Sequence, residues 1–141
     1  MKLLDALMVA TIAGATLLLA TADASFGQDR LVVPLPDVSG LSRDQAQALT
    51  VRVVEADIIG SNCGDYAITD GEWTLLTGTG ELLAEKLELD PVGFEREFRA
   101  PAYELLDDPG ACERLGPKVA PLIAQLVGMG GATRPQAAEA D

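Results

Sequence analysis

Apolar residues recur at intervals of three and four between positions 43 and 61, and this spacing predicts an amphipathic helix. Ser42 is a favoured N-cap residue, because its side-chain oxygen accepts a hydrogen bond from a free backbone N–H in the first turn. Asn62 and Gly64 are stop signals, so we expect Cys63 to lie at the end of the helix. The positions expected to face inward are Ala46, Leu49, Val53, Ala56, and Ile59 or Gly60.

Helical periodicity resumes after Thr69, which together with Glu72 fits a capping box. Gly78 and Gly80 fall inside this second pattern and are candidate breaks, since glycine is a poor helix former. The apolar positions on the expected inner face are Trp73, Leu76, Leu83 and Leu87, with Leu75 and Leu82 beside them.

A third helix is predicted to start at Asp90 and Pro91, because aspartate is a favoured N-cap and proline suits the first helical position. Proline lacks the N–H that a helix interior uses, so Pro101 is expected to kink or end this helix. The side chains expected on its inner face are Phe94, Phe98 and Tyr103.

Asp108 and Pro109 repeat the same start signal, so another helix start is expected just before Cys112. A last helix is predicted over residues 117–129, with a bend at Pro121. Its inward positions are Val119, Leu122, Ile123 and Leu126.

The two ends of this helical pattern are irregular. Residues 25–41 contain glycines and prolines around the apolar run Leu31, Val32 and Val33, which predicts an extended arm whose apolar patch docks on the domain. Residues 129–141 have no periodicity, so a disordered tail is expected there.

Composition agrees with one small ordered domain. A chain of 141 residues has room for one modest core, and 48% hydrophobic residues is too many for a disordered acidic chain. Only 4% of the residues are aromatic, so the core must consist mainly of Leu, Val, Ile and Ala. Apart from a short piece at residues 31–33, no run alternates with the two-residue period of a strand. The sequence therefore predicts an all-α fold, a small helical bundle of about four helices over residues 42–128.

Residues 1–24 have the features of an export signal. Lys2 and the amino terminus carry positive charge ahead of an uncharged stretch from Ala6 to Ala22, and small residues precede Ser25 at the two positions that a signal peptidase reads. We therefore expect cleavage after Ala24 and a periplasmic location. The alternative is a retained N-terminal membrane anchor, since 17 uncharged residues reach the lower limit for crossing a bilayer.

Two cysteines, Cys63 and Cys112, remain after that segment is removed. In an oxidising exported compartment, an even pair in a small domain is most simply one disulfide, which has one connectivity. The alternative is a redox-active or metal-binding pair. The sequence disfavours it, because it has no CxxC motif and no histidine that would complete a metal site.

The chain has 22 acidic and 10 basic residues and no histidine, which gives a formal net charge of −12. Loss of Lys2, Asp5 and Asp23 with the signal leaves 20 acidic and 9 basic residues, a net charge of −11. Because a strongly negative field repels phosphate backbones and anionic lipid surfaces, we expect no nucleic-acid partner. The simplest interpretation of the charge is solubility, and the alternative is a face that binds cations or a basic partner.

The acidic residues with ligand chemistry form two clusters in the sequence, and neither has the spacing of a calcium loop. Helix capping explains Asp70 and Asp108, and nothing in the sequence brings Glu72 and Glu113 to the separation that a glycosidase needs. We therefore expect no catalytic residue, no metal, no cofactor and no small-molecule substrate. The clusters are Asp65, Asp70 and Glu72, and Asp107, Asp108 and Glu113.

Exposed apolar groups are then the best functional signal. Trp73 is the only tryptophan, and small neighbours such as Gly71 and Gly78 let another helix approach it closely. Core packing is the simplest interpretation of Trp73, and a place in an interface is the alternative. The interface candidates are Leu31, Val32, Val33 and Trp73.

The sequence around the two cysteines resembles a known family. The run Ala56-Asp57-Ile58-Ile59-Gly60-Ser61-Asn62-Cys63 and the later run Cys112-Glu113-Arg114-Leu115-Gly116 are similar to small exported alphaproteobacterial proteins with two cysteines and unknown function. The resemblance covers most of the chain after the signal. It implies an export signal, a helical fold and one disulfide, and it implies no activity.

A second resemblance is to periplasmic acid-stress chaperones of the HdeA type. It rests on Cys63-Gly64-Asp65-Tyr66 and on a second cysteine at similar spacing in a small helical domain. Those chaperones have a lysine-rich C-terminal region, whereas this chain has only Arg134 after Lys118.

From these observations we expect an exported, non-catalytic helical domain that acts through protein–protein contacts. Its expected place is as an accessory component at the periplasmic face of a membrane complex. The alternative function is an acid-responsive periplasmic chaperone, which would expose apolar surface and bind clients at low pH.

Overall fold

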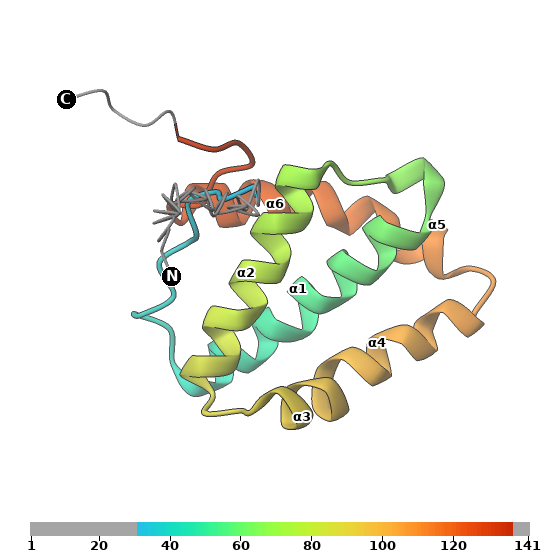
Figure 1. Ribbon diagram of the computed structural model, residues 1–141. Coiled ribbons are helices and arrows are strands. Elements are labelled where there is room, and N and C mark those ends of the chain that lie inside the picture. Colours follow the sequence, from blue (N-terminus) through green and yellow to red (C-terminus); the bar gives the residue numbers. More distant parts are fainter. Residues whose placement is uncertain (1–30, 137–141) are drawn as a thin grey trace, which may run out of the picture.

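The computed structural model describes residues 31–136, so the expected export signal over residues 1–24 lies outside the described residues. Residues 25–30 of the arm and 137–141 of the tail also lie outside them. Within residues 31–136 the fold is all-α, as predicted, and contains no strand. Four helical stretches form the bundle, because α3 runs on into α4 and α5 leads into α6 (Figure 1). The helices are α1 (Arg43–Asn62), α2 (Asp70–Lys86), α3 (Pro91–Phe94), α4 (Ala100–Glu104), α5 (Ala111–Leu115) and α6 (Val119–Gly128).

Capping boxes start both long helices. At α1 the Ser42 hydroxyl accepts the Gln45 backbone N–H at 3.2 Å, and the Gln45 side chain accepts the Ser42 N–H at 2.8 Å. At α2 the predicted Thr69 and Glu72 make the same reciprocal bonds, at 3.2 and 2.8 Å. Each box satisfies two backbone donors that a helix end leaves free, so both predicted starts are confirmed.

The expectation of a break at Gly78 and Gly80 is wrong, because α2 is continuous through both glycines. A Cβ atom on Gly78 would lie 2.7 Å from the Leu35 side chain, and one on Gly80 would lie 3.4 Å from the Phe94 ring. The two glycines therefore give neighbouring side chains room to pack closely on α2.

The third helical stretch starts where Asp90 accepts the Gly93 backbone N–H at 2.6 Å, as the sequence predicts. Pro101 is expected to kink or end this helix, and the helix does not end there. The chain widens into a π-helical turn over Glu95–Arg99, and α4 then continues to Glu104. Where the hydrogen-bond pattern changes from π-helical to α-helical, one backbone carbonyl or N–H has no helical partner. Proline fits at such a point because it has no N–H to leave unpaired.

Aromatic side chains of the third stretch face inward only in part. Phe98 is buried and Phe94 is half-buried, with ring centroids 5.6 Å apart. Tyr103 is 47% exposed, so its prediction as an inner residue is wrong. Tyr103 lies five positions after Phe98, about 140° away around a regular helix, whereas Ala102, four positions after Phe98, is on the inner face and is buried.

The fourth stretch starts later than predicted, since α5 begins after Gly110. Asp108 does not cap it. Its carboxylate accepts the Gly110 backbone N–H at 2.9 Å and pairs with the Arg114 guanidinium. A 3-10 turn over Gly116–Lys118 then leads into α6. Pro121 lies in the first turn of α6, where the backbone N–H groups have no partner within the helix.

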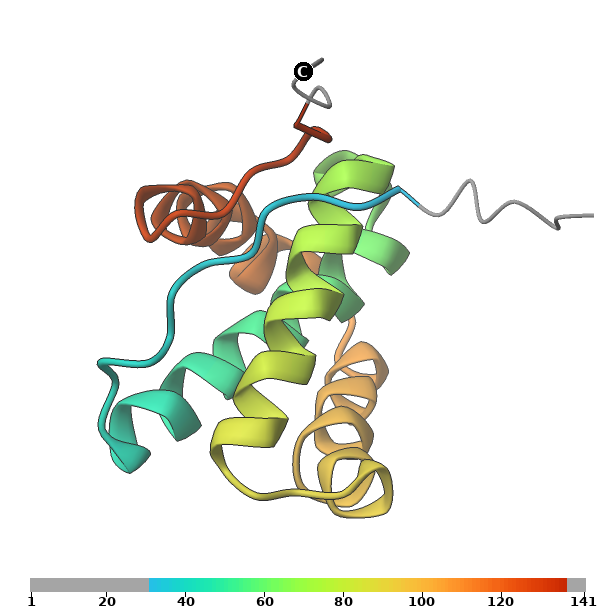
Figure 2. The same cartoon turned by 60° about the vertical axis from the view of Figure 1, so that its left-hand side comes forward.

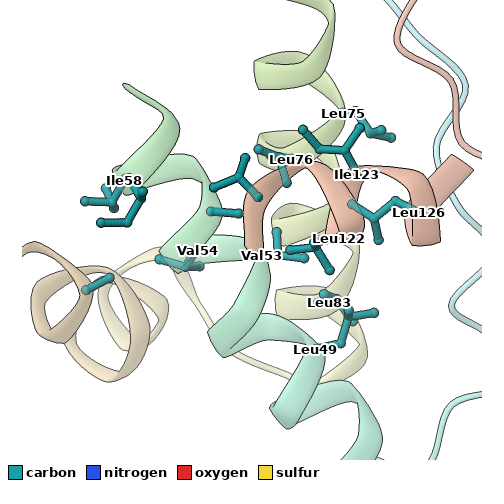
Figure 3. Packing of buried hydrophobic residues seen from close by; sticks show 14 of the residues in the cluster. Leu49, Val53, Val54, Ile58, Leu75, Leu76, Leu83, Leu122, Ile123 and Leu126 are labelled. Atoms are coloured by element: carbon teal, nitrogen blue, oxygen red, sulfur yellow. The ribbon is translucent and has the colours of Figure 1, made fainter. Parts of the chain in front are cut away.

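The core lies where α2 and α6 pack against α1 (Figure 3). It is aliphatic, as the low aromatic content predicts. Two buried hydroxyls are satisfied locally, because Thr50 and Thr79 donate to the carbonyls of Ala46 and Leu75 at 2.7 and 2.6 Å. The largest fully buried apolar side chains are Ile58, Ile59, Leu75, Leu76, Leu83, Leu122, Leu126 and Val53.

Cys63 and Cys112 form the predicted disulfide, with their Cα atoms 5.6 Å apart. The bond joins the end of α1 to α5, so the closed loop contains α2 and the whole third stretch. Close packing holds the same end of the bundle, since a Cβ atom on Gly116 would overlap the ring of Tyr66.

The arm docks on the helices, with Val33 and Val38 buried in the core. Figure 2 shows the arm crossing α2 and running beside the C-terminal segment. Two backbone bonds connect these segments: Asp37 donates to Met129 at 2.9 Å, and Ala132 donates to Pro34 at 3.0 Å.

The expectation of disorder over residues 129–141 is therefore wrong for residues 129–136. Gly130 ends α6 with a φ of 104°, and the Gly131 N–H returns to the carbonyl of Leu126 at 3.0 Å. This is the Schellman arrangement, which needs a residue of positive φ that glycine supplies. Glycine and periodicity alone predict irregularity here, but the contacts with the arm give the segment a fixed course.

Removal of the disulfide is expected to lower the free energy of unfolding by about 4 kcal/mol, because the bond restricts the unfolded chain across 49 positions. Denaturant titrations of the oxidised protein and of a Cys63→Ala/Cys112→Ala variant measure this difference. As a control, reductant should leave the stability of the double variant unchanged. Equal stability of the two proteins would contradict the prediction.

Gly71→Ala is expected to displace the C-terminal segment, because a Cβ atom there would overlap the carbonyl of Thr133. We expect a loss of about 1–3 kcal/mol in stability and faster amide exchange at Gly131 and Ala132. The matched control is Gly128→Ala, where nothing lies near the new Cβ atom. If exchange in the segment is the same in both variants, the segment does not depend on this contact.

Candidate functional site

A groove of about 1160 Å³ runs along α2. Both α2 and the third helical stretch pack on α1 (Figure 1). The floor comes from α1, one wall from α2, and the other wall from the chain that follows α2. The lining residues are Leu31, Val53, Val54, Asp57, Asp70, Trp73, Thr74, Leu76, Thr77, Gly78, Gly80, Glu81, Ala84, Glu85, Leu89, Pro91, Phe94, Glu95 and Arg99.

One face of α2 forms a long wall of the groove. Its main positions, Asp70, Trp73, Thr77, Glu81 and Glu85, are spaced by three and four residues and so lie on the same side of the helix. At 1.5 Å per residue the wall is about 22 Å long, or four turns. The capping box that begins α2 therefore also fixes where this wall begins.

The inside of the groove is apolar. Val53 and Val54 from α1 and Leu76 from α2 are buried at its floor. Trp73 is 50% exposed, so the sequence interpretation of Trp73 as a core residue is wrong. Phe94 lies against Gly80, about two turns along α2 from the indole. Large apolar surface is thus available at two points along the groove.

Arg99 ties the wall formed by the third helical stretch to the floor formed by α1. Its guanidinium bonds to Asp57 of α1 at 3.0 Å, lies 3.5 Å from the carboxylate of Glu95, and donates to the Tyr103 hydroxyl at 3.4 Å. Burial disfavours the charged form, but the hydrogen bonds that Arg99 donates to Asp57 and Tyr103 outweigh this effect and raise the pKa of Arg99. Arg99 is therefore a fixed cation whose charge is already shared by two carboxylates.

The remaining charge in the groove is negative. Asp70, Glu81 and Glu85 are exposed along the α2 wall, and none of them forms an ion pair with another described residue. The groove thus combines an apolar interior with one acidic edge.

The interface candidates from the sequence fall in different places. Leu31 is half-buried and lines the groove with Trp73. Val32 is 70% exposed but does not line the groove. Val33 is 4% exposed and belongs to the core, so its prediction as an interface residue is wrong. In an extended arm neighbouring side chains point in opposite directions, so a run of apolar residues cannot all face a partner.

Sequence reasoning missed the third helical stretch as part of the site. Glu95 and Arg99 lie in the π-turn that packs on α1, and Phe94 lies just before it, against Gly80 of α2. One signal was present: Asp57 sits inside an apolar run of α1, and a carboxylate in such a position needs a buried partner.

The acidic clusters do not gather into a metal site. Within residues 31–136, no set of three or more cysteine, aspartate or glutamate side chains is placed to share a metal ion. Glu72 serves the α2 capping box, and Asp108 pairs with Arg114. The Arg114 hydrogen bond first, and the Gly110 N–H second, hold the pKa of Asp108 below its usual range.

No helix in the described part of the chain is both long and apolar enough to cross a bilayer. Comparisons with protein-family models, curated proteins and solved structures give no significant match.

Acid should remove the contribution of Asp108 to stability. Because its folded pKa lies below the unfolded value, this contribution is present at neutral pH and is lost as pH falls through the folded pKa. We expect the thermal midpoint of the wild type to exceed that of Asp108→Asn at pH 7, and the difference to vanish near pH 2. Glu113→Gln, at an exposed residue without an ion pair, is the control. A difference that persists unchanged at pH 2 would contradict the prediction.

Proposed function

We propose that the protein is an exported, non-catalytic domain that acts through protein–protein contacts, and that its groove receives an amphipathic helix of the partner. The observation that carries this proposal is the half-exposed Trp73 on the wall of the groove. Tryptophan is enriched where proteins bind each other, because its burial by a partner removes a large apolar surface from water.

The shape of the groove favours a helix over other occupants. An α-helix of four turns is about 22 Å long, which matches the wall that α2 provides. A partner helix that lies along α2 would place apolar residues, three and four positions apart, against Trp73 and Phe94. The groove is built on helices and held by the Arg99 bonds, so it needs little rearrangement to bind.

The proposed location is the periplasmic face of a membrane complex, where the protein would serve as an accessory component. Two observations support export: the signal-like composition of residues 1–24, and a disulfide that closes a large part of the domain. The acid-responsive chaperone is retained as the alternative proposal, because ionised carboxylates such as Asp108 stabilise the fold only above acid pH.

A photo-crosslinking amino acid at Thr77, on the groove wall, tests the proposal in cells that export the full chain. We expect a crosslink to a helical segment of one envelope protein, identified by mass spectrometry. Trp73→Ala should abolish this crosslink. Because the indole is half exposed, this variant should keep its helical content and lose little thermal stability.

Val92→Ala is the matched control, since Val92 is exposed and does not line the groove. A crosslink that survives Trp73→Ala, or no crosslink at all, would overturn the proposal. Crosslinks to many unfolded proteins, formed only in acid, would instead favour the chaperone.

A further inference from the structure

We infer that the helix received by the groove is basic, with lysine or arginine side chains one turn apart that face Glu81 and Glu85. This inference rests on the proposed docking function and names the chemistry of the partner. The observation that supports it is the charge of the groove. This observation is separate from the exposure of Trp73, which supports the docking function itself.

The lining residues contain five carboxylates and one guanidinium. Arg99 binds Asp57 at 3.0 Å and lies 3.5 Å from Glu95, so the cation and two of the carboxylates are already matched. The three unmatched carboxylates, Asp70, Glu81 and Glu85, all belong to α2. A partner must therefore place its charges against α2, whereas the opposite wall offers it apolar surface.

The spacing of these carboxylates sets the pattern on the partner. Glu81 and Glu85 are four residues apart and lie one turn apart on the exposed side of α2. Asp70 lies eleven positions earlier, about 16 Å along the helix and close to Trp73. A partner helix packed along α2 can pair with Glu81 and Glu85 if it carries two lysine or arginine residues at positions i and i+4. These residues would flank the apolar side chains that enter the groove.

The same charges disfavour two other occupants. A second copy of this chain carries the same acidic edge, and the formal net charge of −11 after loss of the expected signal makes copies repel each other. An anionic lipid surface is repelled for the same reason. A basic helix is attracted by the field that opposes both.

Exposed ion pairs contribute little each, so the carboxylates act on specificity and association rate more than on total affinity. Neutralising the Glu81 and Glu85 pair is expected to weaken binding of a basic helix by about tenfold at low salt. The apolar contacts at Trp73 and Phe94 should supply most of the affinity.

Synthetic 18-residue amphipathic peptides without tryptophan provide the test. All share one leucine face and carry lysine, glutamine or glutamate at two flanking positions four residues apart. Trp73 is the only tryptophan of the chain, so its fluorescence reports binding in the groove directly. We expect a blue shift and tightest binding with the lysine peptide, about tenfold weaker binding with glutamine, and none with glutamate.

Glu81→Gln/Glu85→Gln should weaken the lysine peptide about tenfold and leave the glutamine peptide unchanged. The matched control is Glu104→Gln/Glu113→Gln, which removes two exposed carboxylates outside the groove. Raising salt should reduce the advantage of the lysine peptide over the glutamine peptide.

Each other outcome has a defined meaning. Equal affinity for the lysine and glutamine peptides overturns the charge inference and leaves helix docking intact. No fluorescence change with any peptide overturns both. A blue shift of the Trp73 fluorescence with anionic phosphatidylglycerol vesicles, and with no peptide, would overturn the inference and assign the groove to a membrane. A blue shift that increases with protein concentration, in parallel with dimerisation measured by sedimentation, would overturn it and assign the groove to a second copy.

Discussion

A carboxylate buried near the C-terminal end of α1 determines the arrangement that the groove depends on. Asp57 is 4% exposed, and a buried charge without a partner is strongly destabilising. The Arg99 guanidinium lies 3.0 Å from the Asp57 carboxylate. Because Arg99 belongs to the π-turn, this ion pair forms only when the π-turn packs on α1. The third helical stretch is thereby held against α1. It contacts α2 where Phe94 lies against Gly80, and the groove is the space between the stretch and α2.

The sequence predicted what local chemistry decides. Ser42, Thr69 and Asp90 cap the helices as expected, because capping is settled within one turn. Apart from Asp108, which bonds to Gly110 and Arg114 and does not cap α5, the errors concern what distant segments decide. Nothing local distinguishes a glycine that breaks a helix from Gly78, which makes room for a side chain of the arm. Likewise Trp73 fits the apolar period of α2 yet faces the groove, since the period does not say which neighbours are present.

The acidic edge meets two demands that the proposed docking role makes on this surface. An apolar groove on a free protein invites self-association, and carboxylates beside it oppose that without filling the groove. The same carboxylates then select among partners that offer a similar apolar face. High negative charge and an exposed tryptophan are therefore compatible features of one surface.

The backbone bonds between the arm and the C-terminal segment bring the two ends of the described chain together. Leu31 lines the groove near Trp73, and Thr133 lies against Gly71 at the beginning of the same helix. A domain whose chain enters and leaves at one pole can be inserted into another protein, or tethered from either side, without strain on its core. A short tether at that pole would hold the groove at a fixed distance from its attachment point and raise the local concentration of any partner held there.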